Sequence, residues 1–301
     1  MRFYTINSMK TLKFTVALLA ALTIAAAEPS VVQFNGNVEI KDDTATAEAE
    51  GNLTVGNTAG ASNVSVAIGE NAQATGLNSL ARGTNANASG NFASAVGSNS
   101  EASGSASIAI GGYAKATGSN CIALGENSSS QGRSGIAMGY QANAEASSVV
   151  LGYQASGKGN TVAIGRGSAS RAEAAVSLGL NASASGKNSM SIGANSYAKG
   201  NESLATGYHA TSLSYRQITL GSYNTEKTDS SLDTWVDTDP IFVIGNGKDT
   251  NNRSDAVVVA KNGDTTINGN TTINGEIKAD RIVTEPKGGI SMGEFGKPQE
   301  Q

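Results

Sequence analysis

Residues 107–111, Ser-Ile-Ala-Ile-Gly, recur along the chain with a period of about fourteen residues, and this repeat decides the fold. Near-copies occur at 65–69 (Ser-Val-Ala-Ile-Gly) and 161–165 (Thr-Val-Ala-Ile-Gly). A fixed period of this length indicates a repeat architecture in which successive copies stack on one another. The glycines that close the repeat are fourteen residues apart, except for two steps of thirteen: Gly69, Gly83, Gly97, Gly111, Gly125, Gly139, Gly152, Gly165, Gly179, Gly193, Gly207 and Gly221.

A second glycine follows the first by seven residues in most copies, as Gly118 follows Gly111. Two glycines half a repeat apart predict two tight turns per coil, each with a positive φ, which costs glycine least. Proline is absent from Ser30 to Asp239, as a continuous hydrogen-bonded ladder requires. We therefore predict an all-β fold, a parallel β-roll of about twelve fourteen-residue coils.

The first strand of the repeat carries apolar residues one and three positions before the glycine, with a small residue between them. Both faces of this strand therefore suit burial. One face must line the roll, and the other must contact something outside it; the sequence does not distinguish them. A copy of the same chain is the simplest partner for the second face, which predicts an obligate oligomer. The residues assigned to this buried or oligomer column are Val66, Ile68, Ile108, Ile110, Ile122, Leu124, Val162, Ile164 and Ile192.

The second strand has one small face and one polar face. Ala114 and Ala116 flank Lys115, for example, so the alanines should be buried and the lysine should meet solvent. The polar column also includes Gln73, Asn87, Glu101, Ser129, Asn143 and Tyr197.

Three polar residues interrupt the apolar columns of the first strand: Arg82, Ser94 and Thr206. They could form a ligand or ion site at the oligomer axis. Alternatively, they are tolerated near the end of a stack or held by symmetry-related hydrogen bonds, and we favour this second interpretation.

The Ser-Val-Ala-Ile-Gly core and its second glycine resemble the head repeat of YadA-like trimeric autotransporter adhesins, from Val64 to about Gly221. This resemblance implies a left-handed roll, a homotrimer about a common axis, display on a bacterial surface and adhesion. The Arg-Gln-Ile-Thr sequence at 216–219 resembles the start of that family's neck. After Ser222 the sequence lacks the sustained heptads of a stalk and the alternating strands of a C-terminal membrane anchor, so we expect no anchor of this chain's own.

The regions outside the roll predict three further segments. Residues 1–27 have the form of a signal peptide, with Lys10 and Lys13 before an apolar stretch and alanines at 25–27, so we expect export to the cell surface or the extracellular space. Residues 28–64 form a predicted N-terminal β cap, in which 34–40 carries a short strand pattern.

Residues 222–301 form a predicted C-terminal β module, which follows the roll at 65–221. Strands are expected within 239–247 and 254–263. The sequence Thr-Thr-Ile-Asn-Gly then occurs at 265–269 and again at 271–275. Such short repeats resemble the shaft-forming segments of phage tail-fibre proteins.

No catalytic, metal or cofactor-binding group is expected. His209 is the only histidine, and Cys121, the only cysteine, occupies a position that is serine or threonine in other copies. Asp233, Asp237 and Asp239 could bind calcium, although a solvated acidic loop is our preferred interpretation. Trp235 could be a sugar-stacking platform or the plug of the C-terminal module, and we favour the plug.

The sequence therefore predicts a non-enzymatic, exported, trimeric adhesin-like or structural surface fibre that binds through its polar outer face. Its expected partners are its own copies and an extracellular-matrix, host-surface or glycan ligand. No basic run is interleaved with aromatic residues, so nucleic acid is not expected as a partner. The alternative is a phage-derived tail-fibre segment that docks to another protein through residues 222–301. A solenoid enzyme of the polysaccharide-lyase kind would need carboxylate clusters, and residues 66–221 contain no aspartate.

Overall fold

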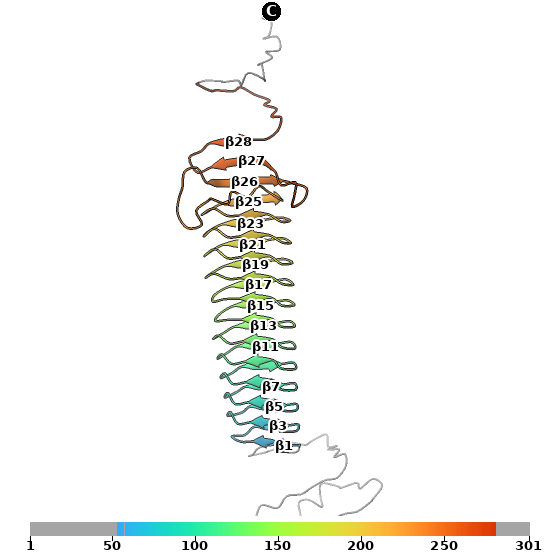
Figure 1. Ribbon diagram of the computed structural model, residues 1–301. Helices are drawn as coiled ribbons and strands as arrows, with labels where there is room; N and C mark the ends of the chain where they lie inside the picture. The colour runs from blue at the N-terminus through green and yellow to red at the C-terminus, as the bar shows by residue number, and fades with distance from the viewer. Residues whose placement is uncertain (1–52, 57, 281–301) are drawn as a thin grey trace, which may run out of the picture. The chain divides into compact units, whose positions relative to one another are not determined.

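Two stacked β-sheets run through the part of the chain that the computed structural model describes, residues 53–56 and 58–280, and strands of the first sheet are labelled in Figure 1. Each coil contributes one strand to each sheet. The first sheet has sixteen strands here: β1 (Leu53–Val55), β3 (Val66–Ile68), β5 (Leu80–Arg82), β7 (Ser94–Val96), β9 (Ile108–Ile110), β11 (Ile122–Leu124), β13 (Ile136–Met138), β15 (Val149–Leu151), β17 (Val162–Ile164), β19 (Val176–Leu178), β21 (Met190–Ile192), β23 (Leu204–Thr206), β25 (Ile218–Ser222), β26 (Pro240–Asn246), β27 (Asp255–Ala260) and β28 (Thr265–Ile267).

The second sheet has twelve shorter strands, each paired in parallel with the equivalent strand of the next coil. They are β2 (Gly60–Ala61), β4 (Gln73–Ala74), β6 (Asn87–Ala88), β8 (Glu101–Ala102), β10 (Lys115–Ala116), β12 (Ser129–Ser130), β14 (Asn143–Ala144), β16 (Ser156–Gly157), β18 (Ala169–Ser170), β20 (Ser183–Ala184), β22 (Tyr197–Ala198) and β24 (Thr211–Ser212). The described residues contain no helix. The predicted all-β parallel solenoid of about twelve turns is confirmed.

The roll begins earlier than the sequence pattern indicated. Strand β1 pairs with β3 in register, with Leu53 opposite Val66, so the first described coil lies inside the segment predicted as a cap. Gly56 has the φ of 131° that marks the first-turn glycines of later coils. The signal peptide predicted at 1–27 and the cap stretch at 34–40 fall outside the described residues.

Small side chains fill the space between the two sheets. Ala109 of β9 is fully buried, whereas Ile108 and Ile110 on either side of it are 37% and 39% exposed. The small middle residue therefore lines the roll, and the large apolar residues point outward, which the sequence alone does not distinguish. Ala116 on the opposing sheet is also fully buried, so alanine meets alanine across a narrow interior.

One coil replaces this alanine pair by a larger and a smaller residue. Val150 takes the interior position of β15, and Gly157 lies across from it on β16. A Cβ added at Gly157 would lie 2.8 Å from Cγ2 of Val150. The glycine therefore makes room for the valine, and the volume of the layer is conserved.

Buried hydroxyl groups replace alanine in some coils nearer the C-terminus. Ser170 Oγ donates to Ser177 Oγ at 2.9 Å, and Ser177 Oγ donates to the carbonyl of Ala169 at 2.9 Å. These bonds satisfy polar atoms that would otherwise be costly inside the roll.

The two turns of each coil use glycine for different reasons. Gly111, in the first turn, has a φ of 132°, which side chains rarely adopt. Gly118, in the second turn, does not have a positive φ, so the prediction of positive φ at the second glycines is wrong for this residue. It is needed because an added Cβ would lie 2.2 Å from the carbonyl oxygen of Gly132 in the next coil.

Asparagine commonly takes the left-handed position in these turns, because its short polar side chain tolerates that conformation better than most. Asn120, two residues after Gly118, has a φ of 56°. The same conformation occurs at Asn71, Asn78, Asn85, Asn99, Asn127, Asn160, Asn181, Asn188 and Asn195.

The C-terminal strands extend the first sheet. Strand β26 pairs in parallel with β25, and β27 and β28 follow as an antiparallel meander. Strands β26 and β27 lie in the two segments predicted as strands, but only the first Thr-Thr-Ile-Asn-Gly copy forms a strand. The second sheet instead ends at the side chain of Asn224, which accepts from the Thr211 N–H at 2.7 Å and donates to the Thr211 carbonyl at 2.9 Å.

Candidate binding surfaces

A continuous apolar surface, here called the outward stripe, follows the outer face of the first sheet. It consists of the residues one and three positions before each first-turn glycine on β1 to β25 and of their register partners on the last strands, which are Phe242, Ile244, Val257, Val259, Thr265 and Ile267. The members on β26 and β27 are half-buried. The stripe extends over every strand of the first sheet. On a typical monomer the largest apolar patch covers only about 300–600 Å², and larger patches mark interaction surfaces.

All nine residues of the predicted buried or oligomer column lie on the outward stripe. In the single chain none of them is fully buried: Ile108, Ile110 and Ile164 are exposed, and the other six are half-buried. They therefore face away from the roll interior, and only a contact outside the roll could cover them.

The three polar interruptions also lie on the outward stripe. Ser94 and Thr206 are half-buried. Arg82 is exposed, with Ile68 and Val96 as its register partners on the neighbouring strands. It forms no hydrogen bond or ion pair with another described residue.

The polar outer column lies on the second sheet, opposite the stripe. Gln73, Asn87 and Lys115 are exposed on consecutive or nearby coils, and Glu101 between them is half-buried. Amide, carboxylate and ammonium groups are therefore mixed along one solvent-facing line. Further along the roll this character fades, because Ala169 and Ser183 at the same position are buried.

The first turns form a second exposed polar line, which sequence reasoning missed. The amide of Asn71 donates to Asn85 at 3.2 Å, and Asn85 donates in turn to Asn99 at 3.1 Å. In a later part of the roll, Tyr140 and Tyr153 stack with ring centroids 5.3 Å apart. The signal was the asparagine that recurs two residues after several first-turn glycines.

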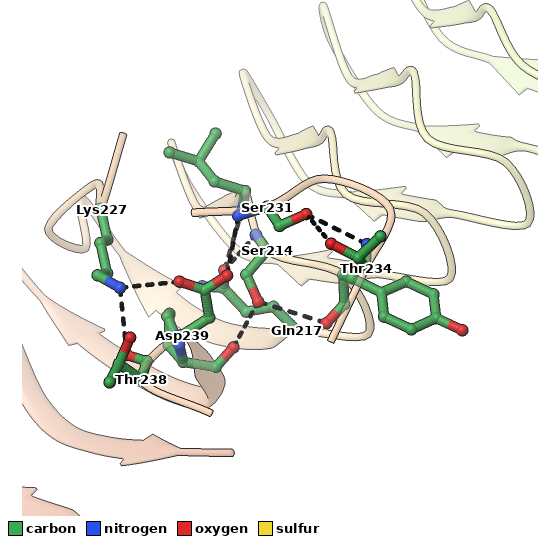
Figure 2. Close-up of polar contacts among 10 residues, drawn as sticks. Ser214, Gln217, Lys227, Ser231, Thr234, Thr238 and Asp239 are labelled. Carbon is green, nitrogen blue, oxygen red and sulfur yellow. Dashed lines mark hydrogen bonds and ion pairs between the residues drawn. The ribbon is translucent and has the colours of Figure 1, made fainter. Parts of the chain in front are cut away.

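Asp239 is the centre of a polar network that holds the loop at 223–239 against the end of the roll (Figure 2). Its side chain accepts from Lys227 Nζ and from the Ser231 N–H, both at 2.8 Å. Burial acts to raise the pKa of this carboxyl, but those hydrogen bonds and the charges of Lys227 and Lys261 outweigh it, so the pKa lies below its usual range. Ser214 Oγ donates to the carbonyl of Pro240 at 2.7 Å in the same network.

The expectation of a solvated acidic loop is wrong for Asp239, which is 1% exposed. Asp233 and Asp237 are exposed and have other partners: Asp233 accepts from Ser231 Oγ at 3.3 Å, and Asp237 from the Trp235 indole N–H at 3.0 Å. Within residues 53–56 and 58–280 no three histidine, cysteine, aspartate or glutamate side chains lie together as a metal site would require.

The interpretation of Trp235 as the plug of the C-terminal module is wrong. Its side chain is half exposed, at 50%, with Lys261 Nζ 5.3 Å from the ring centroid. The indole stays outside the roll, because the chain becomes buried only at Asp239 and Pro240, after the exposed residues 232–238.

The two candidate chemical groups of the sequence lie apart and have structural surroundings. His209 stacks on Tyr223 with centroids 4.6 Å apart, and its pKa is lowered by burial and by the charge of Arg253. Cys121 is buried in the roll, and burial raises the pKa of its thiol, the opposite of what an activated nucleophile needs. No membrane-spanning helix occurs in the described part of the chain.

Replacing Asp239 by asparagine should destabilise the end of the roll by about 1–3 kcal/mol at neutral pH, because a buried charge-assisted network loses its negative charge and one of its two acceptor oxygens. The folded pKa is depressed, so the stabilisation is present above the ordinary value of about 4 and is lost as the pH falls through the folded pKa. Thermal unfolding of both proteins against pH should therefore show a difference that shrinks in acid. Asp233→Asn, at an exposed carboxylate, is the control; equal melting of the Asp239 variant and the unmodified protein at neutral pH would contradict the assignment.

These features define a parallel β-solenoid with a small-residue interior, glycine turns and one apolar outward face. Comparison with protein families identifies the repeat: the YadA head domain repeat matches residues 65–86, 74–100, 102–129, 130–155 and 184–210. The matched residues are therefore YadA-like head repeats, and the resemblance seen in the glycine period is confirmed. No curated protein matches the chain.

Proposed function

We propose that this protein is an exported, non-enzymatic, trimeric adhesin-like surface fibre. The observation that carries the proposal is the outward stripe on a roll of YadA head repeats. A stripe of half-exposed isoleucine, valine and leucine on every strand would be a liability for a monomer in water. Copies of the chain packed side by side, with parallel rolls, would cover it along its whole length.

The trimeric state rests on the family, and the stripe gives it a physical basis. Three copies related by an axis parallel to the stack place the same coil of each copy at the same level. Apolar side chains then meet apolar side chains in every coil, as in an obligate interface. The polar outer column and the exposed asparagines of the first turns remain in solvent, where they are available to a ligand.

Sedimentation of the purified protein, combined with fractionation of the cells that make it, tests this function. A stable trimer that is accessible on the cell surface or released outside is the expected result. A folded monomer would overturn the proposal. Binding to immobilised matrix proteins and to glycans then tests the polar outer column as the contact surface. The trimer of the unmodified protein is compared with that of Lys115→Ala, which removes one charge from this column.

A second candidate function, a fibre segment that docks to another structural protein, is favoured by the C-terminal part of the chain. Ile267, Ile273 and Ile277 are exposed in the Thr-Thr-Ile-Asn-Gly copies and the residues after them. Co-purification of one structural partner that is lost on truncation after Gly263, without surface exposure in cells, would support this function over adhesion.

A further inference from the structure

Arg82 is the only charged residue on the outward stripe of the described residues. The register places it between Ile68 and Val96, with Leu80 on the same strand. Ser94 on the next strand is the only other polar stripe residue before Thr206. Arg82 and Ser94 therefore form one polar step, on β5 and β7, in a stripe that is otherwise apolar from Leu53 to Leu204.

Assembly changes the surroundings of this side chain. In the proposed trimer, on which this inference rests, the symmetry brings the three Arg82 side chains to one level. Their charges are alike, and no stripe residue carries a carboxylate to balance them. Guanidinium groups cannot be deprotonated to escape this cost, so a covered cluster needs a counter-charge.

We propose, in place of the interpretation favoured from the sequence, that the Arg82 side chains of the assembled trimer bind a tetrahedral oxyanion of the phosphate or sulfate class. A guanidinium presents its N–H groups in a planar fork that matches two oxygens of such an anion. Three forks arranged around an axis suit the threefold symmetry of a tetrahedral oxyanion. The anion neutralises the positive charge of the three Arg82 side chains and makes the stability of the assembly depend on anion concentration.

A carboxylate of a neighbouring copy is the competing counter-charge. Glu70 is the candidate for this role. It is exposed and follows Ile68, the register partner of Arg82, by two residues. It forms no ion pair with Arg82 in the single chain as described. Glu70→Gln therefore distinguishes pairing between copies from binding of a free anion.

The experiment is thermal unfolding of the full chain in low-millimolar sodium phosphate, at an ionic strength held constant with sodium chloride. The unmodified protein should melt several degrees higher with phosphate, because a ligand that binds only the folded assembly stabilises it. Arg82→Met, of similar length and without charge, should show no phosphate response. Without phosphate, this variant should melt at or above the temperature of the unmodified protein.

Sedimentation of the same samples separates this inference from the proposed function. Trimers whose melting responds to phosphate only when Arg82 is present support the anion site. Trimers without any phosphate response overturn it while leaving the trimer intact. Destabilisation by Glu70→Gln equal to or larger than the phosphate effect overturns it in favour of a carboxylate pair, and monomers in every sample overturn both proposals.

Discussion

Replacing Ile110 by lysine is expected to convert the assembled protein into a folded monomer. Ile110 is 39% exposed in the single chain, so an ammonium group there can reach water and the roll keeps its alanine interior. In an assembly the same group is covered without a partner, which costs about 3 kcal/mol or more per copy. Association should therefore weaken by at least about a hundredfold per chain, which sedimentation can detect.

Ile164→Lys should behave in the same way, because this residue occupies the equivalent position of another coil. Lys115→Ala is the matched control, since its side chain is exposed on the opposite sheet and should affect neither assembly nor melting. Circular dichroism distinguishes a folded monomer from an unfolded chain. Lysine variants that remain oligomers with unchanged melting would show that the outward stripe is not the contact surface.

The period of the glycines was sufficient to predict the roll, because it reports a geometric requirement that every coil must meet. Each first-turn glycine packs against the carbonyl of the next one, as Gly111 does against Gly125, so any other residue would interrupt the stack. The pairing of strands follows from this requirement, whereas the number of coils was underestimated, because β1 and Gly56 form a coil before the twelve that were predicted. The asparagines in the left-handed positions are an additional signal of the same turns.

The choice between the two faces of the first strand could not be predicted from its own residues. Ile108 and Ala109 are both apolar, and either could be buried in a β-sheet. What decides between them is the distance between the two sheets, which the alanines of the second strand set. Opposing alanines leave room for Ala109 and not for Ile108, so the large residue must point outward.

The loop at 223–239 was less predictable, because contacts distant in the sequence determine its conformation. The Lys261 N–H donates to the carbonyl of Asp239 at 2.9 Å, across more than twenty residues. That contact and Lys227 make Asp239 a buried anchor and leave Trp235 outside. Composition alone made Asp239 look like one of three solvated acids and Trp235 look like a core residue.

Gly111→Ala is expected to disrupt the roll at one coil, at a cost of about 3–5 kcal/mol in the free energy of unfolding. Two independent effects contribute to this cost. The φ of 132° is rarely adopted by a residue with a side chain, and the added Cβ would lie 2.5 Å from the carbonyl oxygen of Gly125. The obstacle is backbone in the adjacent coil, so a rotamer change cannot relieve it, and the ladder on both sides must shift.

Gly112→Ala is the control in the neighbouring residue, and its effect should be small or opposite in sign. An added Cβ there would meet nothing closer than 3.8 Å, and other coils have glutamate, threonine or serine at this position, as at Glu126. Alanine reduces the conformational freedom of the unfolded chain, so stability should be unchanged or higher by up to about 1 kcal/mol. Urea unfolding of the two variants beside the unmodified protein measures the difference. Equal stability of the two variants would mean that the close stacking of first-turn glycines does not limit this fold.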